Sequence, residues 1–158
     1  MALREIVKFG EDILRKKCRE VTSFDEKLGI LLDDMAETLQ SADGVGLAAP
    51  QVGMLRRVVV IDVRDGKGMI ELVNPVVVEQ HGSQTGNEGC LSAPGEWCEV
   101  ERPMKVTVKA CDRHGKEFTV TGDGLLARAL CHELDHLEGI LFIDRVKQDI
   151  PERAEARK

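Results

Sequence analysis

The stretch ALCHELDHLEG, residues 129–139, constrains this chain more than any other part of its sequence. It belongs to an amphipathic pattern over 123–142 that predicts a helix, with Asp123 as the expected cap and Gly139 as the stop signal. The apolar residues recur at spacings of three and four and form one expected buried face: Leu126, Ala129, Leu130, Leu134 and Leu137. His132 and His136 are four positions apart, so their side chains lie on one face of this helix.

Two imidazoles at this spacing can converge on one metal ion. Glu133 projects beside such an ion, where its carboxylate can accept a proton from a metal-bound water. The alternative is a solvated helix face on which the histidines share no ligand. Asp135 favours the metal site modestly, because a ligating histidine usually donates its second ring N–H to an acceptor. If Asp135 is buried it needs a cation, for which Arg102 is one candidate.

A tetrahedral catalytic metal site needs a third protein ligand. The other histidines, His81 and His114, lie in segments expected to be exposed loops, whereas Cys90 lies in NEGCLSAPGEW between a glycine and a short apolar step. Cys90 is therefore the better candidate, although a free cysteine is often simply a small buried hydrophobe. That second interpretation is favoured for Cys18 and Cys111.

The five cysteines are odd in number and have no disulfide-like spacing, which predicts a cytoplasmic chain with reduced thiols. Cys131 precedes His132 by one position, so its side chain is expected to point away from the ion, into the core or the pocket wall. Cys98 is left unassigned.

Length and composition fit one globular domain. The 158 residues predict a single domain over 1–158 with a polar tail at about 149–158, and 42% hydrophobic and 32% charged residues are ordinary values. The net charge of −6 argues against a nucleic-acid binder held by bulk electrostatics. No stretch resembles a signal peptide or approaches the ~20 apolar residues that span a bilayer. Neither a membrane nor a specific nucleic-acid sequence is expected as a partner.

Two helices are expected near the N-terminus. Residues 11–18 indicate a short helix, and 23–44 a longer one in which Ser23 and Glu26 have the spacing of a capping box. Gly44 is expected to end it. The apolar face of the longer helix comprises Leu28, Leu31, Leu32, Met35 and Leu39.

Strands follow these helices. Residues 56–63 predict a buried β-branched strand, and 69–82 a second strand in which Pro75 requires a bend or an edge position. Residues 105–111 and 117–121 alternate and flank the turn DRHG, which predicts a β-hairpin. The order of helix, helix, several strands and helix favours the α+β class over alternating α/β.

Three stretches together are far more specific than any one of them. GVGLAAPQ (44–51), EGCLS (88–92) and HELDH (132–136) resemble, in order and spacing, the three signature motifs of the peptide deformylases, most closely the bacterial type. The resemblance covers the whole chain, including DGLLA before the helix and HLEGILFIDR after it. It implies an α+β fold with antiparallel β-sheets around a central metal-binding helix. It also implies a hydrolase that removes the formyl group from N-formylmethionyl nascent polypeptides and releases formate.

The resemblance further implies roles for single residues. Glu133 would be the general acid/base for a metal-bound water that attacks the formyl carbon, and Gln51 with the backbone N–H of Leu91 would bind the oxyanion. The implied metal ligands are Cys90, His132 and His136. The implied cofactor is one divalent ion, natively Fe²⁺ and replaceable by Zn²⁺, Ni²⁺ or Co²⁺. The implied partners are the formyl-methionyl peptide and the ribosome near its exit tunnel.

The residue types support this chemistry independently. A metal with three protein ligands keeps one position for water and lowers the pKa of that water towards ~7. Oxyanion donors lower barriers by about 3–4 kcal/mol in other enzymes, and Gln51 offers a neutral amide N–H that no pH change removes. One thiolate among the ligands reduces the net charge of the ion and favours softer metals.

GVGLAAPQ has a structural and a functional interpretation. Its small residues can form a tight turn, whereas a dinucleotide-binding loop is excluded because no strand precedes it and the third glycine is missing. Functionally, Gly44 and Gly46 let backbones approach, so that an extended peptide can pair with the N–H and C=O groups of Val45 and Gly46. Glu88 and Gly89 are expected to contact the substrate as well.

The methionine side chain needs an apolar pocket beside the metal. Arg128 and Leu125 lie one and two turns before His132 on the same helix face. Arg128 and Trp97 stand where the family more often has an aliphatic and a basic residue, respectively. In one hypothesis Trp97 lines the pocket and Arg128 folds over its rim, with its stem packed and its head in water. In the other, Arg128 is simply solvent-exposed.

Three other classes share part of the pattern. A zincin-type protease also has H-E-x-x-H, but its third ligand lies downstream, and no histidine follows His136. A cysteine hydrolase would use Cys90 as its nucleophile and would survive chelation. A non-catalytic metal-binding or redox-sensing module would need no base at Glu133.

Overall fold

The computed structural model describes residues 2–146, so the predicted polar tail at about 149–158 lies outside the described residues. Helix α1 spans Glu26–Ala42 and has the predicted apolar face. All five residues of that face are buried: Leu28, Leu31, Leu32, Met35 and Leu39. They pack on one face of the larger sheet and form a core cluster with its second strand.

The ends of the first two helices differ from the prediction. The capping box of Ser23 and Glu26 is wrong, because Asp25 is the N-cap of α1 and accepts a hydrogen bond from the backbone N–H of Leu28 at 3.1 Å. The helix ends one residue before Asp43, which is left-handed with φ 60°. The helix predicted at 11–18 is only a 3-10 turn, Asp12–Arg15.

Five antiparallel strands form the larger sheet, in the order β1-β2-β3-β6-β7. Their bounds are β1 Gly46–Ala48, β2 Val58–Ile61, β3 Ile70–His81, β6 Lys105–Cys111 and β7 Glu117–Asp123. The predicted hairpin is β6–β7, and the strand predicted at 56–63 is β2. All of β2 is buried, because Val58 and Val60 face α1 while Val59 and Ile61 face the opposite core.

Pro75 lies in an interior strand, since β3 pairs with both β2 and β6. The register of the β3–β6 pairing shifts between Val73 and Val76, and Asn74 has φ 53°. A proline has no N–H to donate to a ladder, so a bulge is where an interior strand accepts one. Of the two predicted alternatives, the bend is therefore the one found.

β4 (Gln84–Cys90) and β5 (Ala93–Arg102) form a separate two-stranded antiparallel sheet, which was not predicted. The sequence of β4, QTGNEGC, contains two glycines and no β-branched aliphatic residue, so it has little of the usual strand signal. Its strand β4 carries Cys90, one of the three candidate metal ligands.

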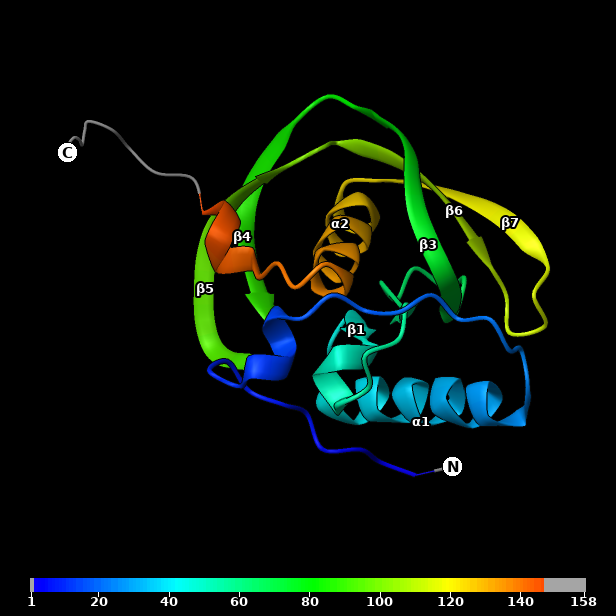
Figure 1. Cartoon of the computed structure of the whole chain (residues 1–158). Helices are drawn as coiled ribbons and strands as arrows, with labels where there is room; N and C mark the ends of the chain where they lie inside the picture. Colours follow the sequence, from blue (N-terminus) through cyan, green and yellow to red (C-terminus); the bar gives the residue numbers. More distant parts are fainter. Residues whose placement is uncertain (1, 147–158) are drawn as a thin grey trace.

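Helix α2 spans Leu125–Leu137 and lies between the two sheets, packed against β1, β2, β6 and β7 on one side and β5 on the other (Figure 1). Asp123 does not cap it, because that residue ends β7 and Gly124 is the N-cap. Gly139, with φ 74°, follows its end as predicted. The α+β architecture around a central helix is confirmed. No helix within residues 2–146 is long and apolar enough to cross a bilayer.

Candidate metal centre and active site

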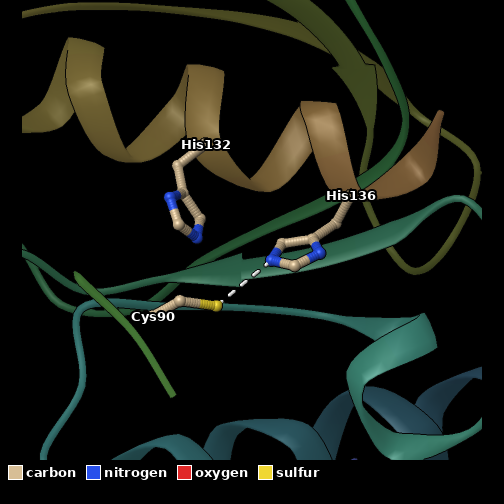
Figure 2. Close-up of side chains that lie close together, drawn as sticks. All are labelled: Cys90, His132 and His136. Carbon is tan, nitrogen blue, oxygen red and sulfur yellow. Dashed lines mark hydrogen bonds between the residues drawn. The ribbon is translucent and has the colours of Figure 1, made fainter. Parts of the chain in front are cut away.

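Three side chains from two elements converge on one point. Cys90 ends β4, and His132 and His136 lie on α2; one ligand atom from each lies within 4.8 Å of the other two. Cys90 Sγ is 3.4 Å from His136 Nε2, and Figure 2 shows both imidazoles directed from the helix towards the sulfur. One sulfur and two imidazole nitrogens form a donor set that suits a divalent transition-metal ion in tetrahedral coordination, because thiolate and imidazole prefer the softer cations.

Glu88 of β4 sets the orientation of His132. Its Oε2 atom is hydrogen-bonded to His132 Nδ1, so Nε2 is the ring nitrogen that faces the cysteine. When Nδ1 carries the proton, the lone pair of Nε2 is free for a cation. On the second histidine, Nδ1 of His136 is buried and has no hydrogen-bond partner among the described residues. The three donors fit a metal ion.

Two arginines hold the Glu88 carboxylate. Arg102 donates from Nε to Oε1 at 3.0 Å and from Nη2 to Oε2 at 2.6 Å, while Arg128 donates from Nη1 to Oε1 at 2.9 Å. Burial alone would raise the pKa of Glu88, but hydrogen bonds and charges from His132 and Arg102 lower it to about 2. Glu88 is therefore ionised at neutral pH and remains an acceptor for His132.

Glu133 is a buried carboxylate beside the ligand cluster. Its Oε1 atom has no hydrogen-bond partner among the described residues, and Oε2 lies 3.9 Å from His132 Nε2. Gly46 packs against it so closely that a Cβ there would lie 2.6 Å from Oε2. Burial raises the pKa of Glu133 to about 7, with opposing contributions that include the positive charge of His132. Such a group can both take up and release a proton near neutral pH.

Gln51 has a defined orientation. The backbone N–H of Ala48 donates to Gln51 Oε1 at 2.9 Å, so the amide nitrogen must face the other way. That nitrogen donates to Ser92 Oγ at 3.1 Å and lies 3.5 Å from Cys90 Sγ. Gln51 therefore presents its N–H group beside the ligand cluster.

A cavity of about 590 Å³ opens onto this cluster. It lies between residues 44–46, which lead into β1, and residues 87–91 at the end of β4, with α2 along one side. Every residue predicted to bind substrate lines it: Val45, Gly46, Glu88, Gly89, Trp97, Leu125 and Arg128. Leu91, predicted to supply a backbone N–H, lines it too.

The family model of polypeptide deformylases matches residues 3–151. This chain belongs to the polypeptide deformylase family. The peptide deformylase of Caldicellulosiruptor bescii is 57% identical over 152 residues, which cover 96% of this chain and 90% of that protein. That of Acetivibrio thermocellus is 58% identical over 152 residues, covering 96% and 88%. The crystal structure of a peptide deformylase from Legionella pneumophila has a TM-score of 0.89 and 46% identity, covering 99% of each chain.

These matches confirm the resemblance of the three motifs to the deformylases. Deformylases are hydrolases of protein biosynthesis that remove the N-formyl group from nascent chains. The family uses a divalent metal, and the cluster of Cys90, His132 and His136 fits one. His81 and His114, set aside as ligands, are exposed. All five cysteines are unpaired thiols.

The partners of Asp135 in this deformylase differ in part from the prediction. Asp135 pairs with Arg102 at 2.8 Å as suggested, and it also binds Arg145 at 2.6 Å. Neither histidine is among its hydrogen-bond partners in the described residues; Glu88 takes that role instead. Glu88 stands two positions before Cys90 on β4, a strand that the sequence did not predict and whose register with β5 shifts between these two residues.

The prediction that the head of Arg128 lies in water is wrong, and so is the alternative of a solvent-exposed arginine. Arg128 is only 8% exposed, and its guanidinium binds Glu88 and the backbone carbonyl of Val100 at 3.1 Å. Trp97 is 69% exposed, and its ring lies against Gly89, where an added Cβ would approach ring atoms to 2.8 Å.

The backbone groups predicted to pair with a peptide are only partly free. The carbonyl of Val45 accepts a hydrogen bond from the N–H of Asp62 at 2.8 Å, within the sheet. Because antiparallel residues alternate in direction, the N–H and C=O of Gly46 face away from β2. β1 is an edge strand, so this side of Gly46 is open to the cavity.

The two histidines respond to burial differently. Burial lowers the pKa of His136 to about 3, and the charges of His132 and Arg102 add to that effect. Burial also acts to lower the pKa of His132, but Glu133, Cys90 and Glu88 outweigh it and raise that pKa to about 10. A cation at the cluster competes with this proton, because metal and proton need the same lone pair.

Proposed function

We propose that Cys90, His132 and His136 hold the divalent ion of this deformylase and that Glu133 is its general acid/base. The convergence of the three ligand atoms within 4.8 Å supports the metal site best. An ion held there would supply Lewis-acid activation of water and of the formyl carbonyl. We propose Fe²⁺ as the native ion, with Zn²⁺, Ni²⁺ or Co²⁺ as substitutes, because one thiolate with two imidazoles suits these softer cations.

Glu133 moves the proton in this proposal. Its Oε1 atom, which has no hydrogen-bond partner within residues 2–146, can accept a proton from the attacking water, and the carboxylic acid then returns a proton to the leaving amine. The burial that raises its pKa to about 7 makes both directions accessible near neutral pH. The reaction breaks the bond between formyl carbon and amine nitrogen and releases formate and a free amino terminus.

Gln51 and Leu91 stabilise the developing oxyanion. The amide group of Gln51 is held with its nitrogen towards Cys90 by the hydrogen bond from Ala48, so no reorientation is needed during the reaction. The backbone N–H of Leu91, the residue after Cys90, is the second donor. The substrate backbone pairs with the free edge at Gly46, and this pairing reads no side chains.

Glu133→Gln tests the assignment of the base. We expect the variant to bind metal normally, measured by elemental analysis of anaerobically purified protein, and to lose formate release by about 10²–10⁴-fold. Glu138→Gln, at the end of the same helix and outside the cavity lining, is the matched control and should keep full activity. Full turnover in Glu133→Gln would contradict the role.

The same assay separates the other enzyme classes. Chelation should abolish formate release and added ion should restore it, whereas a cysteine hydrolase with Cys90 as nucleophile would remain active. A zincin-type protease would cut internal bonds of blocked peptides, which this deformylase should leave intact. A non-catalytic metal module would release no formate at all.

We further propose one catalytic domain over residues 1–158, acting in the cytoplasm on formyl-methionyl nascent chains near the ribosomal exit tunnel. The match of the family model to residues 3–151 supports the domain, and the nature of the substrate supports the location. Sedimentation of the full chain with purified ribosomes, with and without nascent chains, tests the association.

A further inference from the structure

Arg128 has hydrogen-bond donors that the Glu88 network does not use. Both hydrogen bonds that its side chain donates within residues 2–146 come from Nη1, to Glu88 and to the Val100 carbonyl. Its remaining donors are Nε and Nη2. Arg128 lines the cavity, and neither of these atoms is among the fully buried polar atoms without a partner. Both atoms are therefore not fully buried, on a side chain that lines the cavity.

The position of this guanidinium matches the expected place of the first side chain of the substrate. Arg128, Leu125 and Ala129 form the part of the α2 face that precedes His132, and all three line the cavity. On β4, Gly86 lies close to the guanidinium, since a Cβ there would be in van der Waals contact with Nη2 at 3.4 Å. The pocket wall beside the metal ligands thus combines apolar groups with a polar N–H surface.

Because Nη1 is paired with Glu88, the guanidinium is held in place while its other N–H groups remain available as donors. An apolar pocket would reject a first residue that carries an oxygen, since burying that oxygen without a donor disfavours binding by about thirtyfold or more. A pocket with N–H groups in its wall offers the missing partner.

We propose that Arg128 extends the substrate range of this deformylase to formyl peptides whose first residue is methionine sulfoxide. The sulfoxide oxygen, on the δ position of the side chain, accepts a hydrogen bond from Nη2 or Nε. Oxidation turns the apolar thioether into a polar, chiral group, and nascent chains damaged in this way would still be deformylated. This inference rests on the proposed function, because it assigns the first side chain to the pocket beside His132.

The test uses the metal-loaded full chain and three matched peptides that begin with formyl-methionine, formyl-norleucine or formyl-methionine sulfoxide, the sulfoxide as separated epimers. Norleucine has the length of methionine without a heteroatom. The measured quantity is the ratio of kcat/KM for sulfoxide to that for norleucine. We expect a ratio within about tenfold of one for the better epimer and a preference of several-fold between epimers, because the hydrogen bond has a direction.

Arg128→Met removes the donors and keeps the length of the side chain. It should lower the ratio by about 10- to 100-fold, while general damage to the site cancels because it affects both peptides. Arg113→Met is the control, since Arg113 is likewise paired with carboxylates, Glu71 and Asp33, but lies outside the cavity lining. Its ratio should equal that of the unchanged protein.

An unchanged ratio in Arg128→Met overturns the inference. The inference is also overturned if, in the unchanged protein, both sulfoxide epimers have the same kcat/KM and that value is more than a hundredfold below the one for norleucine. This second comparison decides the matter by itself if Arg128→Met does not fold. Absence of formate release from the methionine and norleucine peptides would instead contradict the proposed function itself.

Discussion

Replacement of Glu88 by glutamine removes the charge on which three side chains depend. The carboxylate accepts two hydrogen bonds from Arg102 and one from Arg128, and it also binds His132. Glutamine keeps the shape but has no charge and only one acceptor oxygen. Arg102 would then keep Asp135 as a carboxylate partner, whereas Arg128 would have no paired carboxylate among the described residues.

Two estimates of the resulting loss agree. The pKa of Glu88 is about 2 against an ordinary value of 4.5, which at ~1.4 kcal/mol per pH unit corresponds to about 3 kcal/mol in favour of the ionised, folded form. Removal of one partner from a buried ion pair costs about 3–5 kcal/mol in other proteins. We expect Glu88→Gln to lower the free energy of unfolding by about 3 kcal/mol at pH 7.

Urea unfolding of the metal-free protein measures this loss. Glu79→Gln is the matched control, because its side chain is 61% exposed, and it should change the free energy by less than about 0.5 kcal/mol. The double variant Glu88→Gln/Arg128→Met should be more stable than the sum of the single variants predicts, by about 1–3 kcal/mol, since the second change removes one uncompensated cation.

The pH dependence gives the sign independently. A carboxyl group whose pKa is lowered on folding stabilises the protein fully above its ordinary pKa of 4.5 and loses that contribution as the pH falls towards 2. Stability of the unchanged protein should therefore fall more steeply in this window than that of Glu88→Gln. A loss below about 1 kcal/mol at pH 7, or parallel stability curves between pH 4.5 and 2, would refute this account of Glu88.

Two further variants probe close packing at the site and in the core. Gly46→Ala should reduce formate release tenfold or more, because the new Cβ would lie 2.6 Å from Glu133 Oε2 and must displace it. The control is Gly29→Ala on α1, where the atom nearest to the new Cβ is 3.5 Å away. Equal activity of the two variants would count against this role of Gly46. Met35→Ala, in the fully buried face of α1, should lower the free energy of unfolding by about 2–5 kcal/mol in chemical denaturation, and a change below 1 kcal/mol would mean that the site collapses without a cavity.

Local periodicity accounts for the elements that were predicted well. The apolar face of α1 and the alternation of β6 and β7 depend on residues three, four or two positions apart, so they can be recognised without knowledge of the fold. β4 and β5 were missed because glycine and polar residues dominate β4, and its pairing with β5 is made by backbone groups that every sequence has. Caps failed for a related reason, since Ser23 and Asp25 are equally good capping residues on chemical grounds.

The candidate site divides in the same way. Spacing on a helix identified His132, Glu133 and His136, the lack of another suitable histidine favoured Cys90, and the shared motifs of the family added Gln51. Asp135 was predicted to accept the ring N–H of a ligating histidine, a role that Glu88 has in the structure. Asp135 is a neighbour of the histidines along the chain, whereas Glu88 is 44 residues from His132 and only the fold brings the two together. For Arg128 the sequence left two alternatives, a head in water or simple exposure, and both were wrong because the partner of its head, Glu88, lies 40 residues away along the chain.

The sequence by itself determined which atoms are available and how those on one helix are arranged, since a turn of α-helix has the same geometry in every protein. Only the tertiary structure decided that β4 brings Cys90 and Glu88 to α2, that Gly46 contacts Glu133, and that Arg128 turns inward. These contacts join residues far apart in the chain, and they form only where two sheets pack on one helix. Burial of the charged groups is possible there because their mutual pairing offsets the free-energy cost of removing them from water.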